Sequence, residues 1–202
     1  MPKQMQGVTL VELMIALVLL SILVAIAAPN LKEFSERNRV TAATNQMLSY
    51  LSLARSEAAK RNYNVVLCIR NTEGTGCDTG GTDYSQGVLI FVDYADRTNT
   101  ANNTYDGTTI KYDLDFDDAP DSYEEIIFLS EPITSTYKIV SNRPGNNPTV
   151  IPFAPNGAVA SGTKTFALQT LTKEDNTLKR RIVFNMAGRM RACTVAEGQT
   201  SC

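Results

Sequence analysis

Residues 7–14 read Gly-Val-Thr-Leu-Val-Glu-Leu-Met and open an apolar run that continues without another charge to Ala28. From Val8 to Ala28 the run has 21 residues. A helix rises about 1.5 Å per residue, so one of this length covers roughly the 30 Å hydrocarbon core of a bilayer. The run carries one ionised side chain, Glu12, and a carboxylate inside a membrane span is costly unless a partner neutralises it. The stretch therefore predicts a membrane helix whose glutamate needs a partner.

The segment ahead of this run is short and hydrophilic, with Lys3 before Gly7. With a hydrophobic residue next and Thr-Leu-Val-Glu-Leu at 9–13, the chain resembles the amino-terminal signature of type IV prepilins and type II secretion pseudopilins. The resemblance implies that a membrane-embedded prepilin peptidase cuts between Gly7 and Val8 and methylates the new terminal nitrogen of Val8. It also implies that Glu12 pairs with the terminal amine of a neighbouring subunit. Val8 departs from the family, in which phenylalanine is usual at that position.

A secretory signal is the alternative interpretation of the same run. Residues 25–27, Ala-Ile-Ala, fit a small-x-small cleavage site behind an apolar stretch. Glu12 within the run and a single basic residue ahead of it argue against this interpretation. The two interpretations predict different mature termini, Val8 for a prepilin and Ala28 for a cleaved secretory signal.

Composition limits the remaining function classes. The 202 residues suit one globular domain plus a membrane and stalk helix, and 43% hydrophobic residues suffice for a core. A net charge of −2 gives no global attraction to nucleic acid, so any such binding requires a local patch. The chain has no histidine, the commonest general base, and Ser56 with Lys60 on one helical face is more simply a solvated surface. We therefore expect no enzyme activity and no cofactor.

The four cysteines fall into two pairs, each nine positions apart: Cys68 with Cys77, and Cys193 with Cys202. A body delivered across the membrane meets an oxidising compartment where such pairs close. Of the possible connectivities we favour the two local loops, because each brackets turn residues. Zinc binding is the rival use, but the spacings match no CxxC pair, so we expect no metal here.

A second helical pattern follows Pro29, where a kink is tolerable. An apolar stripe steps by three and four residues through Val40, Ala43, Met47, Leu51, Ala54 and Ala58. The opposite side is polar and carries Asn45, Ser49, Ser52, Ser56 and Lys60. We expect the helix to end near residues 61–62. The predicted organisation is a leader at 1–7, a transmembrane and filament-core helix at 8–30, an amphipathic helix continuing into the head at 31–61, and a globular head at 62–202.

The rest of the chain reads as strands and loops. Short apolar or alternating runs bounded by Gly, Pro, Asn and Asp lie at residues 64–70, 87–93, 109–114, 125–129, 137–141, 149–153, 165–170, 180–185 and 189–194. Their close spacing favours antiparallel hairpins over crossover helices. The predicted fold class is α+β, with a long N-terminal helix packed against an antiparallel sheet.

Several of these runs narrow the resemblance to the GspH/FimT/FimU group of minor pilins and minor pseudopilins. The matching stretches are residues 65–68, 87–93, 153–157, 182–185 and 188–193. The similarity runs nearly end to end, and the terminal hairpin is its distinctive part. It implies a type IV pilin-like fold.

Basic residues gather at this hairpin. Five cations fall within thirteen residues, without an Asp or Glu between them: Lys179, Arg180, Arg181, Arg189 and Arg191. Arg189 and Arg191 are two apart on a predicted strand and share a face, and Gly188 admits the positive φ of a tight turn. Each guanidinium can donate two hydrogen bonds to a phosphate.

Residues 188–191, Gly-Arg-Met-Arg, resemble the GRxR motif through which FimT-type minor pilins are understood to bind DNA for natural transformation. The resemblance implies double-stranded DNA as a partner. The alternative is that the arginines pair with Asp93, with the acidic run near residue 115, or with the next subunit. Few aromatic residues lie nearby, which disfavours base stacking and sequence-specific reading.

An acidic stretch gives a second candidate site. Asp113, Asp115, Asp117 and Asp118, with Glu124 eleven positions after the first, have the spacing of a calcium loop. Its sixth position is aspartate where the sharp turn needs glycine, so a strand with an acidic outer face is the favoured interpretation.

We therefore expect a minor type IV pilin of the FimT/FimU kind that supports pilus assembly and binds DNA for uptake. Its expected partners are other pilins, the prepilin peptidase, the inner membrane and double-stranded DNA. We expect a single-pass inner-membrane protein with a periplasmic head, later incorporated into the pilus at the cell surface. The alternative is an assembly-only minor pilin, or a type II secretion minor pseudopilin, without DNA binding.

Overall fold

The computed structural model describes residues 9–78, 80–94, 104–105, 107, 111–112, 122–134, 136–141, 149–159, 166–172, 178–185 and 187–195. The chain divides into two compact units, Met1–Arg39 and Val40–Cys202. Among the described residues, every buried apolar side chain belongs to the second unit, which is the head. The head therefore has a core of its own.

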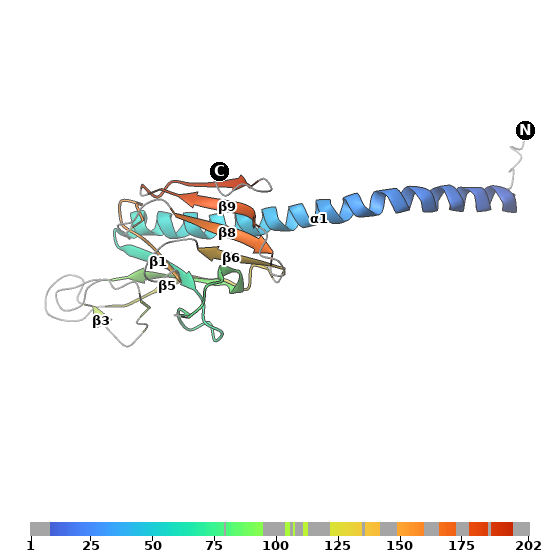
Figure 1. Ribbon diagram of the computed structural model, residues 1–202. Coiled ribbons are helices and arrows are strands. Elements are labelled where there is room, and N and C mark those ends of the chain that lie inside the picture. The colour runs from blue at the N-terminus through green and yellow to red at the C-terminus, as the bar shows by residue number, and fades with distance from the viewer. Residues whose placement is uncertain are drawn as a thin grey trace, which may run out of the picture. The chain divides into compact units, whose positions relative to one another are not determined.

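One helix, α1, runs from Leu10 to Arg61 over 52 residues (Figure 1). It begins at Thr9, whose Oγ1 accepts a hydrogen bond from the backbone N–H of Glu12 at 3.2 Å, as an N-cap does. It ends at Asn62, which has a φ of 62° and donates its N–H to the carbonyl of Ala58 at 3.1 Å. Asparagine is one of the few residues that adopts this left-handed conformation at low cost. The predicted end of the helix is confirmed.

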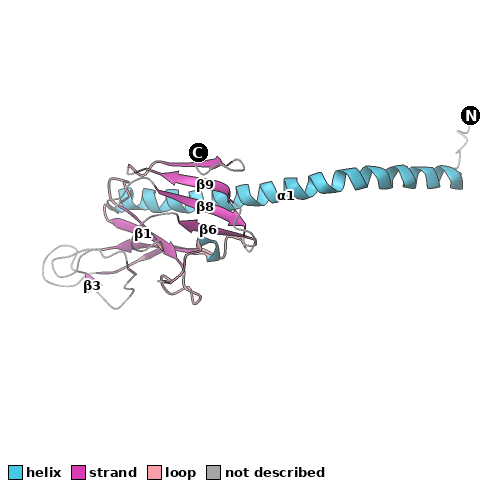
Figure 2. Cartoon of the chain, viewed as in Figure 1, coloured by secondary structure: helices cyan, strands magenta, loops and turns pink. Residues whose placement is uncertain are grey.

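The apolar stripe on the second half of α1 is confirmed as the face that enters the core. All six of its members are at most 4% exposed: Val40, Ala43, Met47, Leu51, Ala54 and Ala58. The predicted polar side is exposed throughout, at Asn45, Ser49, Ser52, Ser56 and Lys60. The core cluster that contains Met47 and Leu51 also holds side chains from the surrounding strands, which gather around this part of the helix (Figure 2).

A first sheet has four antiparallel strands in the order β5-β2-β1-β7. Their bounds are β1 Asn64–Ile69, β2 Val88–Asp93, β5 Ile126–Leu129 and β7 Val150–Phe153. Strands β1 and β2 are buried along almost their whole length because both faces of the sheet are covered. Val65 and Leu67 point into the main core with α1, whereas Val66 and Cys68 belong to a second cluster on the other face.

A second antiparallel sheet has the order β10-β9-β8-β6. Its strands are β6 Tyr137–Ser141, β8 Phe166–Thr172, β9 Leu178–Phe184 and β10 Met190–Thr194. A small pair, β3 Lys111–Tyr112 with β4 Ser122–Tyr123, and a 3-10 turn, η1 Tyr84–Gln86, complete the described elements.

The α+β class and the pilin-like order of helix and antiparallel strands are confirmed, and each predicted strand range overlaps an observed strand. The sequence did not predict β4 or η1. The expectation of simple hairpins is also incomplete. β1 pairs with the distant β7 as well as with β2, and β6 pairs with β8, so neighbours in the sheets are not always neighbours in the chain. Local patterns fix strand positions, whereas such distant pairings depend on how the apolar faces fit together.

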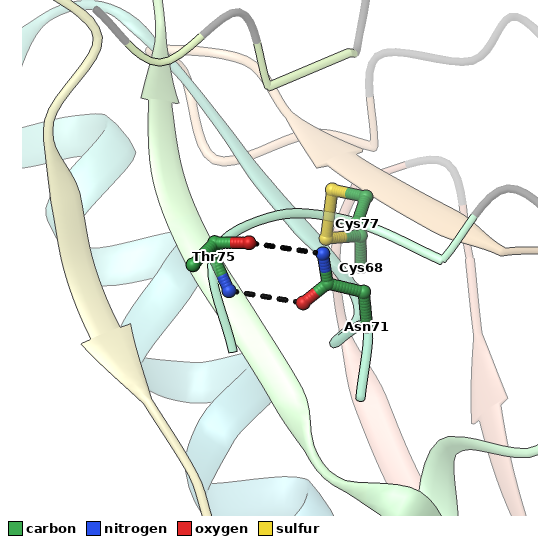
Figure 3. The surroundings of a disulfide bond; sticks show 4 residues. All are labelled: Cys68, Asn71, Thr75 and Cys77. Carbon is green, nitrogen blue, oxygen red and sulfur yellow. Dashed lines mark hydrogen bonds between the residues drawn. A yellow bond between two sulfur atoms is a disulfide. The ribbon is translucent and has the colours of Figure 1, made fainter. Parts of the chain in front are cut away.

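The disulfide between Cys68 and Cys77 is formed, as predicted, and closes the loop after β1. Within that loop the Asn71 side chain accepts from the Thr75 N–H at 2.9 Å and donates to its hydroxyl at 3.2 Å (Figure 3). Cys68 is fully buried and Cys77 packs against it in the second cluster, so the bridge also covers the outer face of the first sheet. Cys193 is disulfide-bonded as well; its predicted partner, Cys202, lies outside the described residues.

Ion pairs fix the end of α1 to the first sheet. Arg61 binds Glu57 on the preceding turn at 2.8 Å and Glu125, just before β5, at 2.5 Å. The hydrogen bond from Arg61 lowers the pKa of the Glu57 carboxyl below its ordinary value. Tyr63 and Tyr94 stack edge to face beside this end, with ring centroids 4.8 Å apart. The junction between the helix and β1 is therefore held by both charge and packing.

We predict that Leu51→Ala lowers the free energy of unfolding of the head by about 2–5 kcal/mol, the range for a buried leucine that leaves a cavity. Leu51 is 0% exposed in the centre of the core. Urea denaturation of the full chain in a nonionic detergent measures the change. The matched control is Ser52→Ala on the exposed side of the same helix turn, which should change stability by no more than about 0.5 kcal/mol. Equal denaturation midpoints for the two variants would contradict the packing described here.

Candidate functional site

The N-terminal candidate residues are only partly within the described structure. Gly7 and Val8, the predicted cleavage and methylation positions, lie outside it. Glu12 lies in the first turn of α1 with an exposed side chain. Its backbone N–H is bound by Thr9, so residues 9–12 have the Thr-x-x-Glu spacing of a capping box. The carboxylate makes no ion pair with any described residue and is available to a group from outside this chain.

The first unit exposes a continuous apolar surface. Every large apolar side chain from Leu10 to Ile26 is at least 52% exposed. Contiguous apolar surface of this kind marks a place where another protein or a membrane binds. Within the described residues, neither α1 nor any other helix contains a stretch long and apolar enough to span a membrane.

The C-terminal candidate site is the hairpin of β9 and β10, joined by residues 185–189. The strands pair in register from Met190 opposite Phe184 to Thr194 opposite Arg180. Gly188 has a φ of 70°, the positive value that the sequence predicted for this turn. The Gly188 N–H donates to the Asn185 carbonyl at 2.9 Å, and the Arg189 N–H donates to the Asn185 side chain at 2.8 Å. The turn is therefore tight and internally hydrogen-bonded.

Arg189 and Arg191 are both exposed on this hairpin. Met190 and Ala192, which alternate with them, pack against the core. Arg189 lies in the turn just before β10 and not on the strand itself, which corrects one detail of the prediction. Neither arginine forms an ion pair with a carboxylate of the described residues, whereas the acidic run at 113–118 lies outside them. Pairing with Asp93, one predicted alternative, is not seen.

The other three basic residues do not all lie on one face with this pair. Arg180 lies opposite Thr170 and shares the face of β9 that carries the buried Ile182. Arg181 lies opposite Cys193 and shares the outward face with Arg191. Lys179, at the start of β9, is half-buried, as are Arg180 and Arg181. The five basic residues thus do not share one face, because Arg180 points to the opposite side of the sheet from Arg181 and Arg191.

Sequence reasoning missed Arg55, which lies on α1 and reaches the hairpin turn. Its Nε donates to the Gly157 carbonyl at 3.0 Å, and its Nη2 donates to the Ala187 carbonyl at 3.3 Å. An open pocket of about 370 Å³ lies beside it, lined by α1, Asn156, Gly157 and Met190. In the sequence Arg55 lies between the apolar stripe and the polar side, and no pattern singles it out.

The acidic candidate site is largely outside the structure. Of the five predicted calcium-loop residues only Glu124 is described, and it is buried. Among the residues with a described placement, no group of three or more cysteine or acidic side chains could hold a metal ion.

A long helix that exposes an apolar N-terminal part and buries its C-terminal part in antiparallel sheets defines the pilin class of filament subunits. The comparisons agree with this class. Residues 43–188 match the family model of the type II transport protein GspH, and residues 2–28 match the prokaryotic N-terminal methylation motif. The first match spans most of the chain, so the protein belongs to the GspH family of minor pilins and pseudopilins, as its motifs suggested.

Solved structures of similar fold include two crystal forms of the type IV minor pilin FimU from Pseudomonas aeruginosa strain PAO1. One is 17% identical with a TM-score of 0.49 and covers 78% of this chain and 90% of that one. The other is 14% identical with a TM-score of 0.46 and covers 75% of this chain and 90% of that one. No curated protein shows a significant match.

We predict that Gly188→Ala destabilises the head by about 1–3 kcal/mol, because alanine is strained at positive φ. In addition, a Cβ at residue 188 would lie 1.9 Å from the Gly157 carbonyl oxygen, so the turn must move. Thermal denaturation of the full chain measures the loss. The control is Gly76→Ala in another turn, where φ is not positive and the nearest atom to the new Cβ is 3.6 Å away. Equal melting temperatures for the two variants would contradict the close contact between the two turns.

Proposed function

We propose that this protein is a minor type IV pilin that enters the pilus through α1 and captures duplex DNA through its C-terminal hairpin. The proposal of DNA binding rests on one observation, the pair Arg189 and Arg191. Both are exposed, neither has a described carboxylate partner, and the residues between and after them are anchored in the core. The head thus presents two guanidinium groups on a supported hairpin.

The chemistry of this pair suits phosphates. A guanidinium donates two parallel hydrogen bonds to a phosphate and stays charged at any physiological pH. Arg181 lies on the same outward face as Arg191, on the neighbouring strand, and can extend the contact along the backbone of the nucleic acid. Phosphate contacts are independent of sequence, and so the expected binding is non-specific.

The assembly part rests on the N-terminal segment. The methylation motif over residues 2–28 supports processing by a prepilin peptidase between Gly7 and Val8 and methylation of Val8. The exposed apolar side chains from Leu10 to Ile26 need cover, which the inner membrane supplies before assembly and neighbouring pilin helices supply afterwards. Glu12 then pairs with the terminal amine of an adjacent subunit. The head lies in the periplasm first and on the cell-surface pilus later.

A second candidate function is assembly without DNA binding, either in a pilus or in a type II secretion pseudopilus. It is favoured by the family description, which is that of a type II transport protein. In both cases the role is structural or adhesive and not enzymatic.

The DNA part predicts that Arg189→Gln combined with Arg191→Gln abolishes binding of the full chain to duplex DNA at physiological salt. Each single variant should reduce the slope of log affinity against log salt by about one, because each removes one phosphate contact. The melting temperature should stay nearly unchanged, since both side chains are exposed. Gel shifts of the detergent-solubilised protein across a salt series, with a denaturation curve for each variant, measure these quantities.

The control for total charge is Arg39→Gln combined with Lys60→Gln, which removes two exposed cations of α1. This variant has the same net charge as the test variant and should bind duplex DNA like the unmodified chain. Equal binding by the hairpin variant and the unmodified chain would rule out the DNA part and leave the assembly-only function.

The assembly part predicts that the purified chain begins at Val8 and carries one extra methyl group on its terminal nitrogen. Intact-mass and terminal-peptide mass spectrometry of protein produced together with a prepilin peptidase measures this. Protein produced without the peptidase should keep residues 1–7 and serves as the control. A chain that begins at Ala28 would instead identify a secretory signal and remove the apolar segment on which assembly depends.

A further inference from the structure

Arg55 links three parts of the chain that are far apart in sequence. It belongs to the middle of the head part of α1 and is half-buried. Its two hydrogen-bond acceptors, the carbonyls of Gly157 and Ala187, lie 102 and 132 residues further on. One belongs to the turn after β7 and the other to the turn between β9 and β10. A single guanidinium therefore joins both turns to the helix.

The two turns also press directly on each other at this point. A Cβ at residue 188 would lie 1.9 Å from the Gly157 carbonyl oxygen and 3.1 Å from the Nε of Arg55. A Cβ at residue 157 would lie 3.0 Å from that same Nε. Both glycines are buried and both have positive φ. The approach thus requires glycine at residue 188, and the carbonyl of Gly157 that receives the hydrogen bond lies at the centre of the contact.

The strand that follows the tip is held on the head, because Met190 and Ala192 pack against the core and Cys193 is disulfide-bonded. Among the described strands, β10 lies at the edge of its sheet and pairs with β9 alone. The hydrogen bonds within residues 185–189 set the internal shape of the turn, since both partners of each bond lie in the turn itself. They do not set where the turn lies on the head. Arg55 supplies a hydrogen-bonded link beside the contact between the two glycine turns, and its acceptor Ala187 is two residues from Arg189.

We propose that Arg55 is the positioning residue of the DNA-binding hairpin: by bonding to the carbonyls of Gly157 and Ala187, it holds the turn that presents Arg189. This inference rests on the proposed DNA-binding function. Planar geometry is essential to it, because Arg55 donates from Nε and Nη2, which are fixed relative to each other, whereas a lysine donates from a single nitrogen on a flexible stem. The role is therefore distinct from that of a cation that only attracts DNA.

The test compares Arg55→Met and Arg55→Lys with the unmodified chain, in full-length protein in nonionic detergent. Hydrogen–deuterium exchange followed by mass spectrometry measures protection of the peptide that covers residues 185–190. Both variants should exchange faster there, while peptides from β1 and β2 keep their protection. Both should also bind duplex DNA about tenfold more weakly, the loss expected when a charge-assisted hydrogen bond that sets the geometry is removed.

The matched control is Lys60→Met, which removes a cation from the next turn of the same helix, where the side chain is 74% exposed. It should change neither exchange nor affinity. Unchanged exchange of residues 185–190 in Arg55→Met overturns the inference, whatever happens to DNA binding. Faster exchange with unchanged affinity also overturns it, and so does full recovery by Arg55→Lys, since charge alone would then suffice. If the unmodified chain does not bind DNA, the proposed function fails, and the exchange data still decide whether Arg55 holds the turn.

Discussion

The head depends on the packing of one helical stripe against strands from both sheets. Six residues of α1, from Val40 to Ala58, are almost completely buried. Three of the six are alanines, and small side chains allow a backbone to come close without a cavity. Because the stripe fixes the helix face that points inward, it also fixes which residues point elsewhere. Arg55 and Ser56 follow directly after Ala54 and leave the core on the side where the two glycine turns meet.

The positions of the strands could be predicted from the sequence, but the sheets could not. β1 and β2 are continuous apolar runs, and this pattern shows a strand buried on both faces without showing what covers it. The disulfide loop covers part of the outer face of this sheet, where Cys77 packs against Cys68. The pairing of β1 with β7 joins segments more than eighty residues apart, and no local signal encodes such a pairing. It follows from the requirement that both apolar faces be covered at once.

The candidate site was also only partly predictable, because side-chain alternation is a local pattern whereas contacts between remote turns are not. The alternation of Arg189, Met190, Arg191 and Ala192 predicts two outward arginines, and burial in the structure agrees. The same rule of alternation separates Arg180 from Arg181, so a count of basic residues along the chain overestimates the patch. Arg55 could not be found in this way, because its importance arises from carbonyl groups that approach it from two remote turns. Backbone carbonyls have no sequence signature.

Arg189 and Arg191 have no carboxylate partner among the described residues, and this affects how their role is interpreted. An exposed ion pair contributes between about 0 and 1 kcal/mol, so the absence of a described partner costs the fold almost nothing. Stability therefore does not explain why two arginines lie at the tip of a hairpin whose other side chains are anchored in the core. Their solvation and their spacing do leave both guanidinium groups free to exchange water for phosphate oxygens. Two exposed charges that add little to the stability of the head, on a hairpin whose neighbouring side chains pack against the core, are the physical basis of the proposed phosphate contact.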